Sequence, residues 1–148
     1  GALRANVLVT VGPAVDPDEL GPQPRHVRVA RYVPQASVLP WCDLVVSHGG
    51  SGAVLGALTW GLPSVLVPLG ADQPQNAARC ADLGVAEVLH APATTPERVR
   101  EAAQRVLDDP AFRRHAARLR DEIAALPGPA EAVRRLEALA GEGRSATR

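Results

Sequence analysis

The chain has 148 residues, 46% of them hydrophobic, which is enough for one domain with a buried core. Its 16 cationic and 16 acidic side chains balance to a net charge of zero, which excludes a broad basic surface for nucleic acid or an anionic membrane. Cys42 and Cys80 lack the spacing of a metal site or a redox pair, so we expect two reduced core thiols.

The sequence contains no signal peptide and no apolar run of membrane length, which favours the cytoplasm. It also contains no methionine, not even at position 1. We therefore expect a processed product or a fragment.

The first part of the chain predicts two strands separated by a loop. Residues 6–12 form a continuous apolar run closed by Gly-Pro, which predicts a buried strand. The proline-rich segment that follows predicts a loop with one helical turn at residues 17–20. Residues 27–30 predict a second strand. Pro34 cannot serve a central ladder, and residues 36–41 predict at most a short helix.

The next segment, residues 43–58, reads DLVVSHGGSGAVLGAL. Residues 43–47 predict a buried parallel strand, residues 48–52 a glycine turn, and the residues from Ser51 to about Trp60 a helix. A strand, a glycine turn and a helix start place free backbone N–H groups together at the positive end of a helix dipole. This pattern predicts an anion site, with phosphate as the expected anion. The alternative is a tight corner whose glycines only permit close packing.

Two familiar phosphate loops are excluded at this turn. The P-loop requires a lysine after its glycine, and the chain has no lysine. The dinucleotide fingerprint G-x-G-x-x-G fails because, after Gly50 and Gly52, its third position falls on Leu55.

The rest of the chain alternates between strands and helices and then becomes helical. The predicted elements are a strand at 64–67, a helix at 74–83, a strand at 85–89 and helices at 96–107, 110–126 and 130–140. This order predicts an α/β domain over residues 1–140, with an open parallel Rossmann-like sheet, flanking helices and C-terminal helices. Residues 141–148 are predicted to be a disordered tail.

Three polar stretches fall at the carboxyl ends of successive strands, the edge at which open α/β sheets bind ligands. They are Tyr32-Val-Pro-Gln35, His48-Gly-Gly-Ser-Gly52 and Gly70-Ala-Asp72-Gln73. Together they resemble the nucleotide-sugar-binding half of the two-domain GT-B glycosyltransferases. The resemblance is strongest to the group of plant secondary-metabolite enzymes and actinobacterial macrolide enzymes, and it covers roughly residues 6–139.

The resemblance implies a role for each stretch. It assigns the base and ribose to Tyr32, Val33 and Gln35; the diphosphate to His48, Gly49, Gly50, Ser51 and Gly52; and the sugar hydroxyls to Asp72 and Gln73. The chemistry agrees, because an aromatic ring offers a π-face to a base and fixed N–H donors suit phosphate oxygens. A carboxylate with an amide suits vicinal hydroxyls.

Several assignments have a structural alternative. The Tyr32 ring could pack under a loop, and His48 could be a core histidine with satisfied hydrogen bonds. Asp72 could cap the helix that starts near Pro74.

Two positions depart from the family pattern. Ala53 stands where a hydroxyl residue is usual, and Gly56 stands where the family has a ribose-binding glutamate. The missing carboxylate favours a deoxyribose donor and therefore a thymidine diphosphate sugar.

The resemblance implies the donor-binding half of an inverting, metal-independent glycosyltransferase. Such an enzyme would transfer a sugar from a TDP- or UDP-sugar to a small aglycone in secondary-metabolite or antibiotic biosynthesis. The family's general base and acceptor pocket lie in the other half. We therefore expect no catalytic residue, metal ligand or cofactor in this chain, and an acceptor domain or subunit as its partner.

By the family's order, a strand is absent between residues 6–12 and 43–47, so we expect the chain alone to be inactive and to expose unpaired strand edges. Two alternatives remain open. One is a stand-alone donor-binding subunit that needs a separate acceptor subunit, and the other is a GT-B nucleotide-sugar epimerase.

Overall fold

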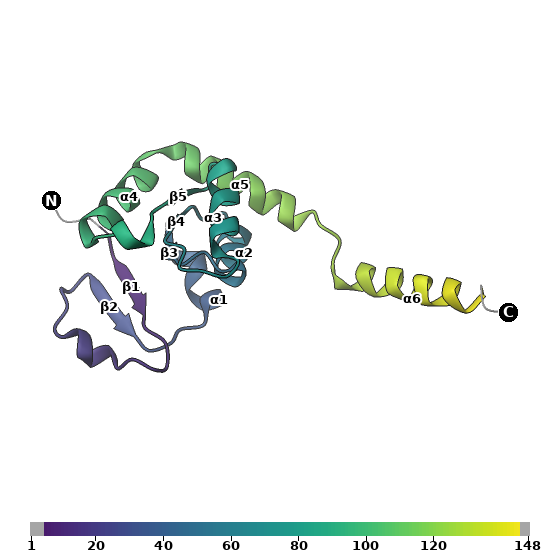
Figure 1. The fold of residues 1–148 in the computed structure, drawn as a ribbon, viewed down its shortest axis with the longest axis horizontal. Helices are drawn as coiled ribbons and strands as arrows, with labels where there is room; N and C mark the ends of the chain where they lie inside the picture. The colour runs from purple at the N-terminus through teal and green to yellow at the C-terminus, as the bar shows by residue number, and fades with distance from the viewer. Residues whose placement is uncertain (1–4, 146–148) are drawn as a thin grey trace.

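The computed structural model describes residues 5–145 and shows an α/β fold with parallel strands (Figure 1). The strands are β1 (Val7–Thr10), β2 (Val27–Ala30), β3 (Val45–Ser47), β4 (Ser64–Leu66) and β5 (Ala86–Val88). The α-helices are α1 (Gln35–Val38), α2 (Ser51–Thr59), α3 (Gln73–Asp82), α4 (Pro96–Asp108), α5 (Pro110–Ala124) and α6 (Pro129–Ser145). Short 3-10 turns are η1 (Pro17–Leu20), η2 (Leu39–Trp41) and η3 (Ala91–Ala93). Every predicted strand and helix is confirmed to within a few residues.

The strands form two sheets. The sequence predicted one open sheet that lacks a strand between residues 6–12 and 43–47. β1 pairs in parallel with β2, and β4 lies between β3 and β5 in a second parallel sheet. Within the described residues, β1 and β3 each have one strand partner. No strand pairing joins the two sheets within residues 5–145, and by the family's order the absent strand would lie between β1 and β3.

The core is built around β4, whose three residues are all buried. Val65 and Leu66 are both 0% exposed, and because side chains alternate along a strand they face opposite sides of the sheet. Val65 packs against Ala102, Ala103 and Val106 of α4. On the other side, the cluster around Leu66 comprises Leu58, Ala77, Cys80, Val85, Ala86 and Ala116. The three-stranded sheet is thus covered on both faces, by α4 on one and by α2, α3 and α5 on the other.

The smaller sheet is less well covered. None of residues 5–38 is buried, so β1 and β2 have at most half-buried side chains. Leu8 on β1 is 39% exposed and Val46 on β3 is 50% exposed. β1 and β3 thus each combine a single strand partner with an exposed apolar side chain.

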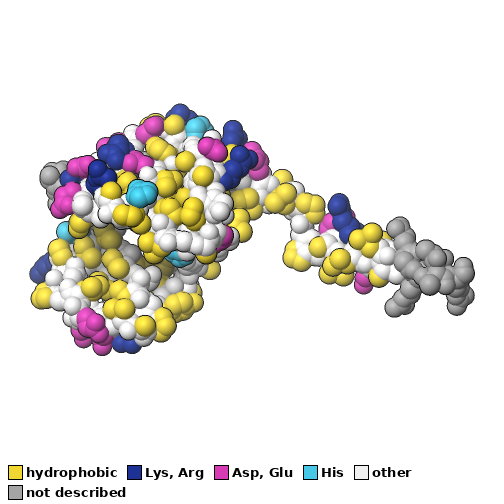
Figure 2. Space-filling view, viewed as in Figure 1, with side chains coloured by type: hydrophobic (Ala, Val, Ile, Leu, Met, Phe, Trp, Pro, Cys, Tyr) yellow, Lys and Arg dark blue, Asp and Glu magenta, His cyan; other side chains and the backbone are white. Residues whose placement is uncertain are grey.

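Helix α6 is longer than predicted. It continues to Ser145, so residues 141–145, predicted as part of a disordered tail, are helical, while residues 146–148 lie outside the described part of the chain. The glycines at 141 and 143 weaken a helix by about 1 kcal/mol each without ending it. Figure 1 shows α6 projecting away from the rest of the fold, and Figure 2 shows apolar side chains along it.

Two smaller expectations can be compared with the structure. Cys42 and Cys80 are both free, as predicted, but only Cys80 is buried, and Cys42 is half-buried. Burial raises the pKa of both thiols, and the nearby Asp43 carboxylate adds to the effect at Cys42. Between residues 5 and 145, no helix has both the length and the apolar composition needed to cross a bilayer.

A tight backbone contact at Gly61 yields a stability prediction. Gly61 has a φ of +64°, and a Cβ there would lie 3.3 Å from the Cα of Ala117 in α5. We expect Gly61→Ala to lower the free energy of unfolding by about 1–2 kcal/mol, because it combines left-handed strain with displacement of α5. Chemical denaturation measures this loss.

The matched control for this substitution is Gly70→Ala. Gly70 lies outside the positive-φ region, and a Cβ there would meet no heavy atom within 4 Å. Its effect should stay within about 0.5 kcal/mol. Equal effects of the two substitutions would contradict this account of the packing between α2 and α5.

Candidate functional site

The turn between β3 and α2 presents backbone donors that the helix does not use. The first hydrogen bond inside α2 runs from the Val54 N–H to the Gly50 carbonyl, at 3.0 Å. The N–H groups of residues 51–53 precede that bond, and the N-cap residue Gly50 supplies no side-chain capping bond. An uncapped helix start with a positive dipole end is suited to an anion. The predicted arrangement of backbone N–H donors is therefore present at this turn.

The three glycines of this turn have different roles. Gly49 is buried with a φ of +83°, and a Cβ there would contact Leu66 and the Gln73 backbone at 3.6–3.9 Å. Gly50 has an ordinary φ of −64°, but a Cβ there would lie 2.7 Å from Nε2 of His48. Gly52 would meet nothing within 4 Å. The positive φ accounts for the glycine at position 49, because a Cβ there would make only ordinary van der Waals contacts. Neither backbone strain nor packing accounts for Gly52, which faces open space.

His48 is exposed, so the alternative of a buried core histidine is wrong. The absence of a side chain at Gly50 lets the His48 ring lie against the turn. The ring nitrogen Nε2 thus lies beside the uncapped helix start, where it can donate to the same anion as the backbone.

Asp72, at the far end of the loop after β4, is tied directly to this turn. The Ser51 hydroxyl donates to Oδ2 of Asp72 at 2.7 Å, and the side-chain amide of Asn76 donates to the same oxygen at 2.9 Å. Asp72 occupies the N-cap position of α3 but makes no side-chain capping bond. The alternative that Asp72 caps this helix is therefore wrong, because its carboxylate is turned toward α2.

The hydrogen bonds at Asp72 also affect its titration. The Ser51 hydroxyl and then the Asn76 amide hold the pKa of the exposed Asp72 carboxyl below its usual range. Asp72 is ionised at neutral pH, and these hydrogen bonds extend its ionised range to lower pH.

The neighbouring residue, Gln73, has a divided role. Its Oε1 accepts hydrogen bonds from the backbone N–H groups of Leu69 and Gly70, at 2.8 and 3.1 Å. The carbonyl end of the side chain therefore holds the loop, and the NH₂ end is what remains for a ligand. The loop also contains Ala71 at a φ of +55°, which is uncommon for a residue other than glycine and which no sequence signal indicated.

The first stretch approaches α2 further along the helix. Tyr32 is 75% exposed, so its ring does not pack under a loop. Val33 is half-buried, and Gln35 is the first residue of α1. A Cβ on Gly56 would lie 3.2 Å from Oε1 of Gln35, so the Gln35 amide occupies the space into which a side chain at position 56 would extend. The structure therefore gathers parts of all three stretches around α2.

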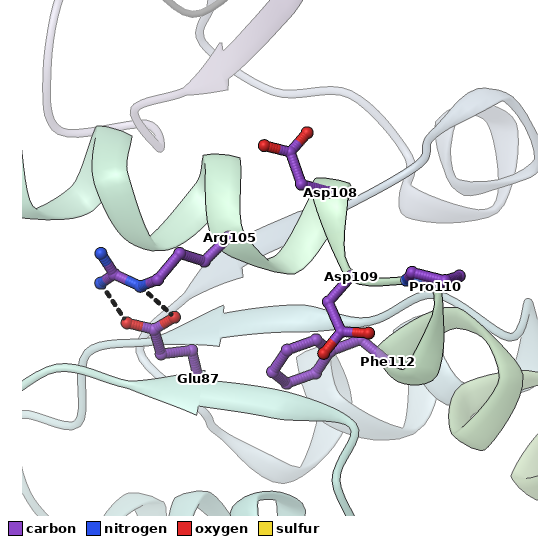
Figure 3. A pocket seen from close by; sticks show the side chains of 6 residues that line it. All are labelled: Glu87, Arg105, Asp108, Asp109, Pro110 and Phe112. Atoms are coloured by element: carbon purple, nitrogen blue, oxygen red, sulfur yellow. Dashed lines mark hydrogen bonds and ion pairs between the residues drawn. The ribbon is translucent and has the colours of Figure 1, made fainter.

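A hollow elsewhere on the surface is unsuited to an anion. It is lined by Glu87, Arg105, Asp108, Asp109, Pro110 and Phe112 (Figure 3). Arg105 is engaged by both oxygens of Glu87, with Nη2–Oε1 at 2.5 Å and Nε–Oε2 at 3.1 Å. The carboxylates of Asp108 and Asp109 add negative charge there. None of the predicted site residues lines this hollow, and residues 5–140 offer no group of three potential metal ligands.

Comparison with known proteins connects this geometry to a family. The family model described as "Erythromycin biosynthesis protein CIII-like, C-terminal domain" matches residues 1–139. The chain belongs to this family. The CIII-like domain is 44% identical over 117 residues to a 3-alpha-mycarosylerythronolide B desosaminyl transferase of Saccharopolyspora erythraea, covering 79% of the chain and 28% of that enzyme.

Solved structures of glycosyltransferases share its fold. The CIII-like domain is similar to CalG4, the calicheamicin glycosyltransferase, with a TM-score of 0.86 and 36% identity over 93% of the chain and 36% of CalG4. It is also similar to the glycosyltransferase VinC in complex with DTDP, with a TM-score of 0.83 and 29% identity over 96% of the chain and 43% of VinC.

These similarities confirm the resemblance to GT-B glycosyltransferases of antibiotic biosynthesis and the α/β fold. The chain spans about a third of the length of the curated relatives it matches, 28% and 33% for the first two.

The bond from Ser51 to Asp72 yields a prediction about titration. Ser51→Ala removes the largest cause that lowers the pKa of Asp72, so this pKa should rise toward its ordinary value. A carboxyl with a depressed pKa stabilises the fold above its unfolded-state pKa, and this contribution is lost as the pH falls through the folded-state pKa. The variant should lose that contribution at neutral pH.

Carbon NMR of the Asp72 carboxyl, followed against pH, measures this shift. Ser37→Ala, at an exposed serine of α1, is the control and should leave the Asp72 titration unchanged. An unchanged pKa in Ser51→Ala would show that the hydrogen bond does not persist in solution.

Proposed function

We propose that this CIII-like domain is the donor-binding part of an inverting, metal-independent glycosyltransferase acting in the cytoplasm. The enzyme would transfer a sugar from a thymidine or uridine diphosphate sugar to a small-molecule aglycone, with the nucleotide sugar as substrate and no further cofactor. The observation that carries the proposal is the uncapped start of α2, which lies beside His48 and is hydrogen-bonded through Ser51 to Asp72.

The proposed diphosphate site follows from the charges at this turn. Backbone N–H groups at residues 51–53, the helix dipole and a His48 ring nitrogen all favour negative charge. The same groups would stabilise the diphosphate as it departs during transfer, which is the electrostatic contribution that an inverting reaction needs from its donor side. No metal ion is needed in this proposal, since the neutralising groups belong to the protein.

The sugar and the nucleoside would extend from the two ends of the diphosphate. Asp72 and the NH₂ end of Gln73 would contact sugar hydroxyls, while Tyr32 and the Val33 backbone would meet the base, with Gln35 near the ribose. The Gln35 amide lies against Gly56, where a glutamate would otherwise project. This neutral contact favours a deoxyribose, and the VinC complex with DTDP supports a thymidine donor among similar enzymes.

The acceptor pocket and the general base would belong to another domain or subunit. Two alternatives use the same donor site: a separate donor-binding subunit, and a nucleotide-sugar epimerase. The named transferase activity of the relatives favours transfer over epimerisation. A separate acceptor subunit remains compatible with the donor site.

The first test places a negative charge at the helix start. We expect Gly52→Asp to reduce the affinity for thymidine diphosphate at least tenfold, because like charges a few ångströms apart repel each other. The fold should tolerate the change, since a Cβ at position 52 would meet nothing within 4 Å and an acidic residue suits the first turn of a helix.

Gly52→Asn is the matched control, because it has the same shape without the charge. Calorimetric titration of both variants and the parent separates charge from size. If Gly52→Asp binds as tightly as Gly52→Asn, the diphosphate lies elsewhere.

A second test concerns the chain by itself. Among residues 5–145, β1 and β3 each pair with only one strand, and each carries an exposed apolar side chain. Their unpaired edges can therefore pair with strands of another molecule. We expect the 148-residue chain to self-associate, to bind nucleotide weakly and to show no transfer with a donor and a phenolic acceptor. Light scattering and a transfer assay measure this. Turnover by a monodisperse monomer would contradict it.

A further inference from the structure

Asn76 joins the two loops of the proposed donor site, although no sequence motif pointed to it. Its side-chain NH₂ group lies 3.0 Å from the Gly49 carbonyl, 3.2 Å from the Ser51 hydroxyl and 2.9 Å from Oδ2 of Asp72. Gly49 and Ser51 belong to the turn after β3, whereas Asp72 belongs to the loop after β4. One carboxamide therefore touches both sides of the site.

The backbone beneath Asn76 is held in place. Its N–H donates to the Asp72 carbonyl at 3.1 Å within the first turn of α3, and the next residue, Ala77, is 1% exposed in the core. The carboxamide is thus mounted on a helix that is packed against the sheet, while the Ser51 and Asp72 side chains it contacts are exposed. A rigid residue of this kind can set the positions of more mobile ones.

We propose that Asn76 is a positioning residue for the sugar nucleotide, a role that rests on the proposed function. The Ser51 hydroxyl donates its one proton to Asp72. A diphosphate bound at the start of α2 needs that same proton, and a hydroxyl cannot donate it to two acceptors. Ser51 then donates to the diphosphate. The Asn76 amide still donates a hydrogen bond to the Asp72 carboxylate and keeps it directed toward the sugar.

The role of Asn76 therefore differs for the two parts of the ligand. Free thymidine diphosphate uses the helix start and needs Asp72 only to release the Ser51 hydroxyl. A thymidine diphosphate sugar also needs the Asp72 carboxylate in a fixed position. Loss of Asn76 should weaken sugar-nucleotide binding more than nucleotide binding, whereas a general loosening of the fold would weaken both equally.

The test compares Asn76→Ala and Asn76→Asp with the parent chain, using thymidine diphosphate and thymidine diphosphate glucose at up to millimolar concentration in calorimetry. Asn76→Ala removes three hydrogen bonds, one of them to the charged Asp72 and two to the turn residues Gly49 and Ser51. Loss of the charged bond should lower the affinity for the sugar nucleotide about tenfold, and loss of the two neutral bonds should lower that for the diphosphate about threefold or less. Asn76→Asp retains the side-chain shape and adds a charge facing Asp72, so it should lose more sugar-nucleotide affinity than Asn76→Ala. Gln75→Ala, at the adjacent exposed residue, is the control and should match the parent.

A readout without ligand completes the test. The Asn76 amide contributes to lowering the pKa of Asp72, so the carboxyl titration followed by NMR should move upward in Asn76→Ala. Equal losses for both ligands, or an unchanged Asp72 titration, would overturn the positioning role. If the parent chain binds neither ligand, the proposed function itself fails; if it binds and Asn76→Ala binds the sugar nucleotide equally well, only the positioning role fails.

Discussion

The site depends on the left-handed backbone at Gly49. This residue is buried between β3 and the loop after β4, and its φ of +83° turns the chain so that α2 begins directly after the strand. Any side chain there would combine backbone strain with contact against Leu66 and the Gln73 backbone. Because β4 is fully buried between helices on both faces, the corner rests on a rigid support. The unused donors of α2 are therefore fixed before a ligand arrives, which lowers the entropic cost of binding.

Polar contacts around α2 then connect segments that are distant in the sequence. Each exposed hydrogen bond contributes little to stability, on the order of 1 kcal/mol. Their effect is geometrical: Ser51 and Asn76 direct the Asp72 carboxylate toward the helix start, and Gln73 fixes the loop that carries it. Gln35 approaches the same helix at Gly56. All three loops of the site therefore approach the same helix, α2.

The sequence predicted those features that local chemistry determines. Apolar runs identified the strands, including the buried β4, and prolines located η1 and the starts of α4 and α5. The glycine turn and the uncapped helix start were also recognisable. Asn76 was missed because its partner Gly49 lies 27 residues away, and such a contact has no local signal. The orientation of the Asp72 carboxylate toward α2 was missed for the same reason, because Ser51 lies 21 residues away. The division into two sheets was anticipated only through the family's order, since an apolar run shows that a strand forms but not which strand it pairs with.

The central claim is that the start of α2 receives the diphosphate of the donor. The most direct measurement is a titration of the ¹⁵N-labelled chain with thymidine diphosphate, followed by the backbone amide resonances. We predict that the largest shifts occur at Ser51, Gly52 and Ala53, with a smaller set in the loop that carries Asp72. Shifts confined to the hollow formed by Glu87 and Arg105, or an absence of change at residues 51–53 while nucleotide is bound, would contradict the account.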